Sequence, residues 1–253
     1  MILLETVIVA FSMFSAVPMP RIEWNARNMR FSLCAFPLIG LLIALCSWGW
    51  ERLSIVLSLP VLLRGAGLCL IPVVITGGIH LDGYADTCDA LASHSGIERR
   101  QEILKDPHMG AFAAIRLCMY FLAQFALWTS LKTLRFPVLL GLFCLSRTLS
   151  GLSLTLFPLR EGSGLARSFA DAADKEKVRV LLMIAAGGLS LGLALLQAWE
   201  LPLAAGLVFL LYRRVCEREF GGLSGDLAGW FLQKAEIWML ASLVLRQYLG
   251  AVL

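Results

Sequence analysis

The chain has 253 residues, of which 58% are hydrophobic and 16% are charged, and its net charge is +4. Soluble domains are about 45–50% apolar and about 25% charged, so this composition argues against an ordinary soluble enzyme and against a disordered chain. The modest positive charge, without a basic cluster interleaved with aromatic residues, also argues against a nucleic-acid partner. We therefore expect one polytopic membrane domain that covers residues 1–253.

Six apolar runs are long enough to cross a bilayer as helices, which takes about 20 residues. They lie at 31–50, 54–78, 111–131, 136–157, 179–199 and 227–252. Two shorter runs, at 2–17 and 201–212, are either short spans or helices that lie in the membrane interface. The expected fold class is therefore an all-α integral membrane bundle with about 7–8 transmembrane helices.

Four hydrophilic stretches, at 18–30, 80–110, 158–178 and 213–226, hold most of the charge. Eight crossings place all four stretches on one face, which then carries 14 of the 22 Lys and Arg residues when Arg179 is counted with them. Positive residues favour the cytoplasmic side of a membrane. We expect this face to be cytoplasmic and to carry a long acidic loop at 80–110.

The strongest chemical signal in that loop is an aspartate triplet, Asp82, Asp86 and Asp89. Helical geometry places these positions on one face, where three like charges repel one another. Mg²⁺ prefers carboxylate oxygens and bridges to substrate phosphates, so it would relieve this repulsion. We predict that the triplet is catalytic and holds Mg²⁺, with Asp106 completing the set. The alternative is an acidic helix face in solvent.

Other residues of this segment are candidates for binding a phosphorylated substrate: Gly77, Gly78, His80, Arg99 and Lys105. The glycines would allow the backbone to approach a phosphate closely. The imidazole would bond to an aspartate or a phosphate, because cysteine partners at zinc-finger spacing are lacking. The two cations either clamp phosphate oxygens or pair with Glu98 and Glu102 in solvent.

Three ionisable residues outside the loop are further candidates for substrate binding. Arg147 and Glu236 lie within apolar runs, where charged side chains are costly and mark either functional sites or interhelical ion pairs. Lys234 is one possible partner for Glu236, and a polar cavity is the other environment that would suit that carboxylate. Asp226 lies at a helix start, where it is either an N-cap or a second metal ligand.

The segment Gly77–Ala90 reads GGIHLDGYADTCDA, which resembles the signature of the cobalamin synthase family, the adenosylcobinamide-GDP ribazoletransferases. The blocks RRQEILKDPHMGAF and FGGLSGDLAGW are similar to later blocks of that family, and the resemblance covers nearly the whole chain. It implies a Mg²⁺-requiring membrane enzyme of cobalamin biosynthesis that joins adenosylcobinamide-GDP to α-ribazole, or to its phosphate, and releases GMP. Tyr84 departs from the family's usual Leu, and Pro107-His108 from its usual Ser-Arg.

In such a reaction we expect either Asp86 or Asp106 to accept the proton of the attacking hydroxyl. A phosphotransferase of the CDP-alcohol type is an alternative, although its D-G-x-x-A-R pattern and its later D-x-x-x-D are not matched. A transporter is a weaker alternative, because it would place acidic residues near the bilayer midplane. The expected partners are the bilayer and the two substrates, without nucleic acid, and a homo-oligomer stays open.

Overall fold

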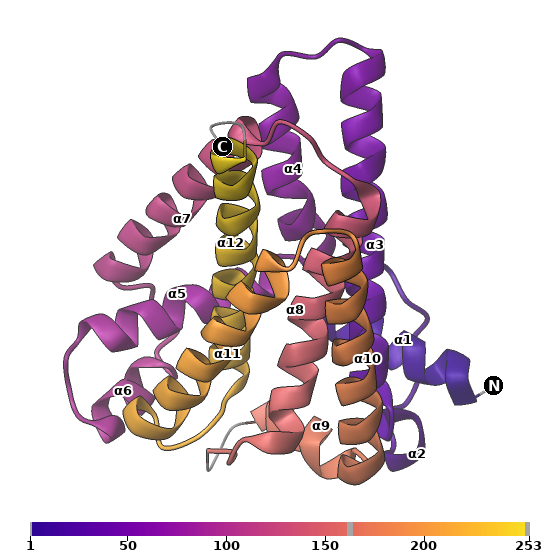
Figure 1. Ribbon diagram of the computed structural model, residues 1–253. Coiled ribbons are helices and arrows are strands. Elements are labelled where there is room, and N and C mark those ends of the chain that lie inside the picture. Colours follow the sequence, from indigo (N-terminus) through magenta and orange to yellow (C-terminus); the bar gives the residue numbers. More distant parts are fainter. Residues whose placement is uncertain (1, 161–163, 251–253) are drawn as a thin grey trace.

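The computed structural model describes residues 2–160 and 164–250, and within these ranges it contains twelve helices and no strand (Figure 1). In chain order they are α1 (Ile2–Phe14), α2 (Ala26–Met29), α3 (Ser32–Val56), α4 (Val61–Thr76), α5 (Ile79–Ala92), α6 (Ile97–Ile103), α7 (Ala111–Ser130), α8 (Phe136–Leu156), α9 (Gly164–Ala172), α10 (Lys175–Leu195), α11 (Glu200–Glu219) and α12 (Gly225–Leu249). The chain is therefore all-helical over the part that the structure describes.

Four of the described helices are long and apolar enough to cross a bilayer, namely α3, α7, α8 and α10. The bent pair α4 and α5 raises this number to five if it is counted as one span. The predicted 7–8 spans are not confirmed. The helices α1 and α4, with 13 and 16 residues, are short for a hydrocarbon core of about 30 Å, and α11 and α12 carry several charged residues.

Two glycines make the corner between α4 and α5. Gly77 and Gly78 have φ angles of +66° and +80°, a region that is costly for residues with a Cβ atom. The two helices consequently meet at 95°. The long loop expected at 80–110 is not observed, because α5 and α6 occupy much of it. The apolar face of α5, with Leu81, Tyr84 and Cys88, is buried and stabilises this helix in place of a loop.

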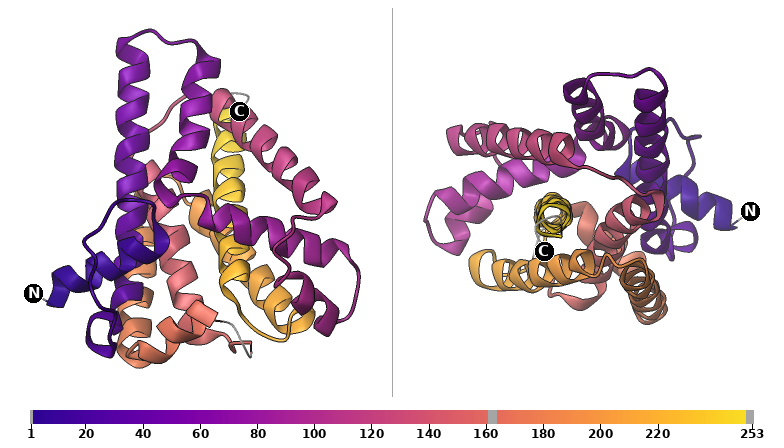
Figure 2. Two further views of the ribbon diagram at one scale, coloured as in Figure 1. Left: turned by 180° about the vertical axis from the view of Figure 1, so that it is seen from behind. Right: turned by 45° about the horizontal axis from the view of Figure 1, so that its top comes forward.

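The helix α12 stands at the centre of the bundle, where it contacts α5, α7, α8 and α11 (Figure 2). Of the four membrane-capable helices, α8 is almost wholly buried, whereas α7 and α10 are mostly exposed. The exposed face of α10 carries Val180, Leu181, Ile184 and Leu191. Contiguous exposed apolar side chains suit contact with lipid rather than water, so this protein is built as a membrane protein.

Candidate active site

A cavity of about 330 Å³ lies between α1, α5, α8, α9 and α12. Its polar lining comes from residues that are far apart in the sequence: His80, Asp82, Ser150, Arg160, Ser224 and Asp226. Three of them were predicted as site residues from the sequence, and the fold brings these three together in one place. Polar groups that converge in one concave site are the usual mark of a ligand-binding pocket.

Two glycines allow α5 and α12 to approach closely enough to form one wall of the cavity. A Cβ atom on Gly83 would lie 2.7 Å from the Cα and carbonyl oxygen of Asp226. A Cβ atom on Gly229 would lie 2.8 Å from the carbonyl oxygen of His80. Because backbone atoms cannot move aside as a flexible side chain does, this contact requires glycine at both positions.

We expect Gly83→Ala to lower the free energy of unfolding by about 1–3 kcal/mol and to reduce activity, because the added methyl group pushes the backbone of Asp226 away from α5. The matched control is Gly188→Ala in α10, where a Cβ atom meets nothing within 4 Å. Thermal unfolding in detergent checks both variants. Equal midpoints for the two would contradict the close contact between α5 and α12.

A short backbone bridge ties the connection after α8 to the connection before α12. Leu159 pairs with Leu223 in a parallel bridge, in which the Arg160 amide donates to the Leu223 carbonyl at 3.0 Å. Gly222 fits here without a side chain, since a Cβ atom would lie 2.7 Å from the Arg160 nitrogen. The bridge therefore holds Arg160 beside the first turn of α12, which carries Asp226.

The carboxylates around the cavity repel one another. Burial raises the pKa of Asp86 to about 6, and the charges of Asp82, Asp226 and Asp89 add to the rise. Asp226 also lies close enough to the guanidinium of Arg160 for the two charges to interact. The charge of Asp226 thus acts on the aspartate triplet. The site has a surplus of negative charge, and a bound cation would stabilise it.

Asp226 is not the N-cap of α12. Ser224 takes that role, because its hydroxyl accepts a hydrogen bond from the Leu227 amide at 3.4 Å. The same hydroxyl group lies 3.3 Å from the Asp226 carboxylate, to which it donates. Of the two roles that the sequence left open for Asp226, the structure assigns the cap to a different residue and leaves this carboxylate on the cavity wall.

His80 is buried, with 6% of its surface exposed, and it lines the cavity. Burial, with a smaller effect from the charge of Arg147, lowers its pKa to about 3, so the imidazole is neutral at physiological pH. Its Nε2 atom has no hydrogen-bond partner among the described residues. A buried polar atom without a partner is costly, and a ligand in the cavity would remove that cost.

Asp89 has a contact that sequence spacing did not predict. Its carboxylate accepts a hydrogen bond from the Ala113 amide at 3.3 Å, in the first turn of α7. A Cβ atom on Gly110 would lie 2.1 Å from one of its oxygens. Asp89 therefore stabilises the start of α7, as a negative charge at a helix N-terminus does, and it is not among the residues that line the cavity.

The remaining candidates from this segment lie outside the cavity lining. Asp106 is exposed and accepts hydrogen bonds from the His108 amide and ring, at 2.9 and 2.8 Å. Arg99 is exposed and pairs with Glu102 at 2.8 Å, which was the solvent alternative considered for it. Lys105 is exposed on the connection after α6, and the glycines at 77 and 78 form the corner between α4 and α5.

Arg147 and Glu236 form an ion pair inside the bundle, with 1% and 4% of their side chains exposed. The Ser146 hydroxyl donates to the same carboxylate at 3.0 Å. Among the described residues Lys234 makes no ion pair with Glu236, and its ammonium lies 5.8 Å and 5.9 Å from the ring centres of Tyr84 and Trp230. Of the alternatives considered for the two buried charges, the structure shows the interhelical ion pair.

The fit of a metal ion to this cavity follows from its carboxylates. Within residues 2–160 and 164–250, no three His, Cys, Asp or Glu side chains converge into a preassembled metal centre. Mg²⁺ does not need one, because it commonly uses one or two carboxylates and takes its other ligands from water and substrate phosphates. Asp82 and Asp226, which both line the cavity, meet that requirement.

Residues 6–244 match the protein family described as cobalamin-5-phosphate synthase. The chain belongs to this family. It is 41% identical to the adenosylcobinamide-GDP ribazoletransferase of Lachnoclostridium phytofermentans over 92% of this chain and 91% of that one. It is 33% identical to the proteins of that name from Clostridium botulinum (93% and 95% covered) and Geobacillus sp. (90% and 90% covered). No solved structure matches the chain.

This membership confirms the family that the motif at Gly77–Ala90 indicated, and the chain is a transferase of cobalamin biosynthesis. Sequence reasoning missed three polar residues of the cavity, Ser150, Ser224 and Arg160, and a signal was available for Arg160. The available signal was its position, because it is a charged residue that follows an apolar span directly.

Proposed function

We propose that this chain joins adenosylcobinamide-GDP to α-ribazole, or to α-ribazole phosphate, and releases GMP. The observation that carries this proposal is the cavity in which Asp82, Asp226 and His80 meet in a member of the cobalamin-5-phosphate synthase family. Two carboxylates beside a neutral imidazole are suited to a diphosphate that is bound together with a divalent cation.

In this reaction the attacking hydroxyl forms a new oxygen–phosphorus bond, and the bond between the two phosphates breaks with GMP as the leaving group. The chain must position both substrates and receive the hydroxyl proton. Of the two candidate bases, Asp86 suits the task better, because its raised pKa of about 6 makes it a stronger base than an ordinary aspartate. Asp106, exposed and bonded to His108, is the weaker candidate.

We also propose Mg²⁺ as the cofactor, held by Asp82 and Asp226 with Asp86 nearby. When bound, the ion would neutralise the negative charge that develops on the leaving phosphate. The carboxylates hold it at the cavity wall, and His80 provides a hydrogen-bonding group for the substrate. The sequence predicted that Asp82, Asp86 and Asp89 hold the ion. We now propose Asp226 in place of Asp89, because the carboxylate of Asp89 accepts a hydrogen bond at the start of α7.

We expect Mg²⁺ to raise the thermal midpoint of the protein more at about pH 7.5 than at about pH 5. Asp86 has a folded-state pKa of about 6 against an ordinary value of 3.8, so without metal its ionisation destabilises the fold as pH rises from about 4 through 6. Mg²⁺ binds the ionised form and offsets this loss above pH 6. A free concentration of about 100 Kd would stabilise the fold by about 2.7 kcal/mol.

Thermal scans in detergent at both pH values, with Mg²⁺ or EDTA, check this prediction. Asp86→Asn serves as the comparison, because it removes the group that titrates near pH 6 and should reduce the difference between the two pH values. A Mg²⁺ increment that is the same at both pH values would exclude Asp86 from the metal site.

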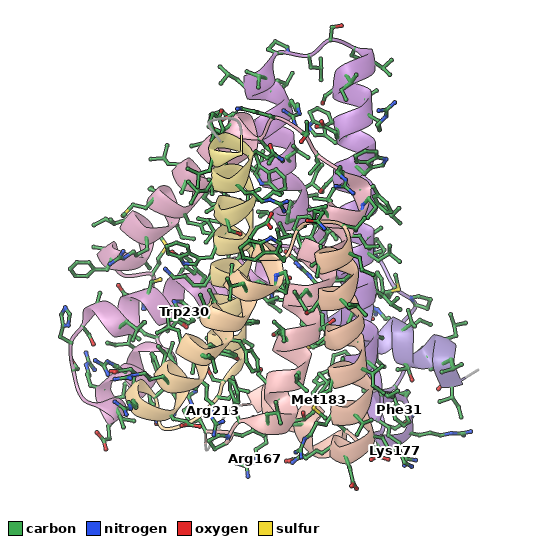
Figure 3. The ribbon with its side chains drawn as sticks, viewed as in Figure 1. Phe31, Arg167, Lys177, Met183, Arg213 and Trp230 are labelled. Carbon is green, nitrogen blue, oxygen red and sulfur yellow. The ribbon has the colours of Figure 1, made fainter. Side chains whose placement is uncertain are left out.

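For localisation we propose the bacterial inner membrane, with the cavity open to the cytoplasmic side. The support is the basic end of the bundle, where Arg167, Lys177 and Arg213 all lie (Figure 3). We further propose that α4, α11 and α12 cross the membrane with the four apolar spans. A cysteine-free variant with single cysteines at 98 or 132, on either side of α7, tests the proposed orientation, because an impermeant reagent should label only position 132 from outside.

A turnover assay tests the function itself. Membranes that contain the protein are incubated with adenosylcobinamide-GDP, α-ribazole and Mg²⁺, and GMP and the corrinoid product are measured. We expect both to form in equal amounts. Turnover of a CDP-activated lipid in place of this pair would favour the CDP-alcohol phosphotransferases, and uptake of a solute without GMP release would favour a transporter.

A further inference from the structure

Arg160 is a buried cation whose side-chain bonding is incomplete. Only 6% of its surface is exposed, and its Nε and Nη1 atoms have no hydrogen-bond partner among the described residues. Within the same ranges it makes no ion pair inside 4.0 Å, although the charge of Asp226 partly offsets the effect of burial on its pKa. A buried guanidinium with free donors carries a large desolvation cost, which an anionic ligand would remove.

The backbone bridge to Leu223 fixes where this guanidinium can act. Arg160 lines the cavity beside the start of the 25-residue helix α12, where Ser224, Gly225 and Asp226 also line it. A helix N-terminus attracts anions through its free amides and its dipole. Two independent features, an unpaired buried arginine and a long helix N-terminus, thus favour an anion at the same end of the cavity.

The carboxylates of Asp82 and Asp226 line this cavity too, and by themselves they would repel an anion. The combination suits a ligand that brings its own cation, as a diphosphate does. We propose that Arg160 binds a phosphate of the nucleotide diphosphate, while the aspartates face the divalent cation. This inference rests on the proposed function and names the residue that recognises the activated substrate. Arginine is well suited because its planar group donates to two phosphate oxygens at once.

The test compares the two substrates in Arg160→Gln and Arg160→Lys. We expect Arg160→Gln to raise the KM for adenosylcobinamide-GDP by at least about tenfold and to leave the KM for α-ribazole within about twofold, since only the first substrate carries the diphosphate. Arg160→Lys keeps the charge but cannot donate to two phosphate oxygens in the same way. Its KM for adenosylcobinamide-GDP should therefore lie between the values for the wild type and for Arg160→Gln. The matched control is Arg179→Gln, because Arg179 donates to the Thr155 carbonyl at 2.6 Å and does not line the cavity.

A second measurement does not depend on turnover. We expect GDP with Mg²⁺ to raise the thermal midpoint of the wild-type and Arg179→Gln proteins, and to raise that of Arg160→Gln much less. If Arg160→Gln does not fold, Arg160→Lys carries both comparisons. The absence of a shift with wild-type protein, an equal shift in the Arg160 variant, or parallel changes of both KM values would overturn the proposal. Wild-type GMP release is scored separately, so loss of the proposed function is distinguished from loss of this role.

Discussion

Asp82→Asn is expected to lower the rate of GMP release by about 100-fold or more, while the protein remains folded. Asp82 is exposed at the cavity, so the amide fits without a packing cost. The substitution removes one of the two carboxylates that line the cavity, and with it the charge that would hold a divalent cation against the diphosphate. It also relieves repulsion with Asp86, so the thermal midpoint should stay equal or rise.

The measurement is kcat with saturating Mg²⁺ and both substrates. A suitable control is Asp171→Asn, since Asp171 is an exposed aspartate on α9 that pairs with Arg167 and Lys175 at 3.6 and 3.5 Å. Near-normal turnover of Asp82→Asn would remove this residue from the reaction. A loss of similar size in both aspartate variants would indicate a general effect of surface charge.

Glu236→Leu is expected to lower the free energy of unfolding by about 3–5 kcal/mol, because it leaves the guanidinium of Arg147 buried without its partner. The double variant Arg147→Met/Glu236→Leu should recover most of this loss, since a matched apolar pair costs little in an apolar interior. A double-mutant cycle measures this coupling: thermal unfolding in detergent is compared for the wild type, Arg147→Met, Glu236→Leu and the double variant.

The same cycle separates a structural role from the substrate role that the sequence suggested for these two residues. A double variant that is stable and active assigns the pair to the architecture of α8 and α12. One that is stable but inactive would return Arg147 and Glu236 to the substrate site. Additive losses in the two single variants would contradict the ion pair itself.

Helical periodicity was enough to predict that the aspartate triplet shares one helix, because that pattern is local. All three members lie on α5. It was not enough to find the fourth carboxylate, Asp226, because this residue is 137 positions from Asp89 in the chain. Its place beside the triplet depends on Gly83 and Gly229, which allow α5 and α12 to touch.

The same limit applies to contacts that sequence spacing did not predict. Asp89 has the spacing of a metal ligand, yet its carboxylate meets the start of α7. Glu236 is close in sequence to Lys234, yet α8 presents Arg147 to it instead. In each case the partner of the carboxylate depends on which helix packs against its own helix. The neighbouring residues in the chain do not reveal which helix that is.

The class of the protein could be predicted from the residues alone, because its apolar runs are long enough to cross a bilayer and its GGIHLDGYADTCDA segment indicates the family. Both are properties of contiguous residues, which composition and spacing express directly. The packing of the helices was needed to show that the glycines at 77 and 78 turn α5 across the bundle, that the bridge between Leu159 and Leu223 places Arg160 at the cavity, and which charges pair. These features arise from contacts between distant segments, whose geometry depends on the packing of the whole bundle.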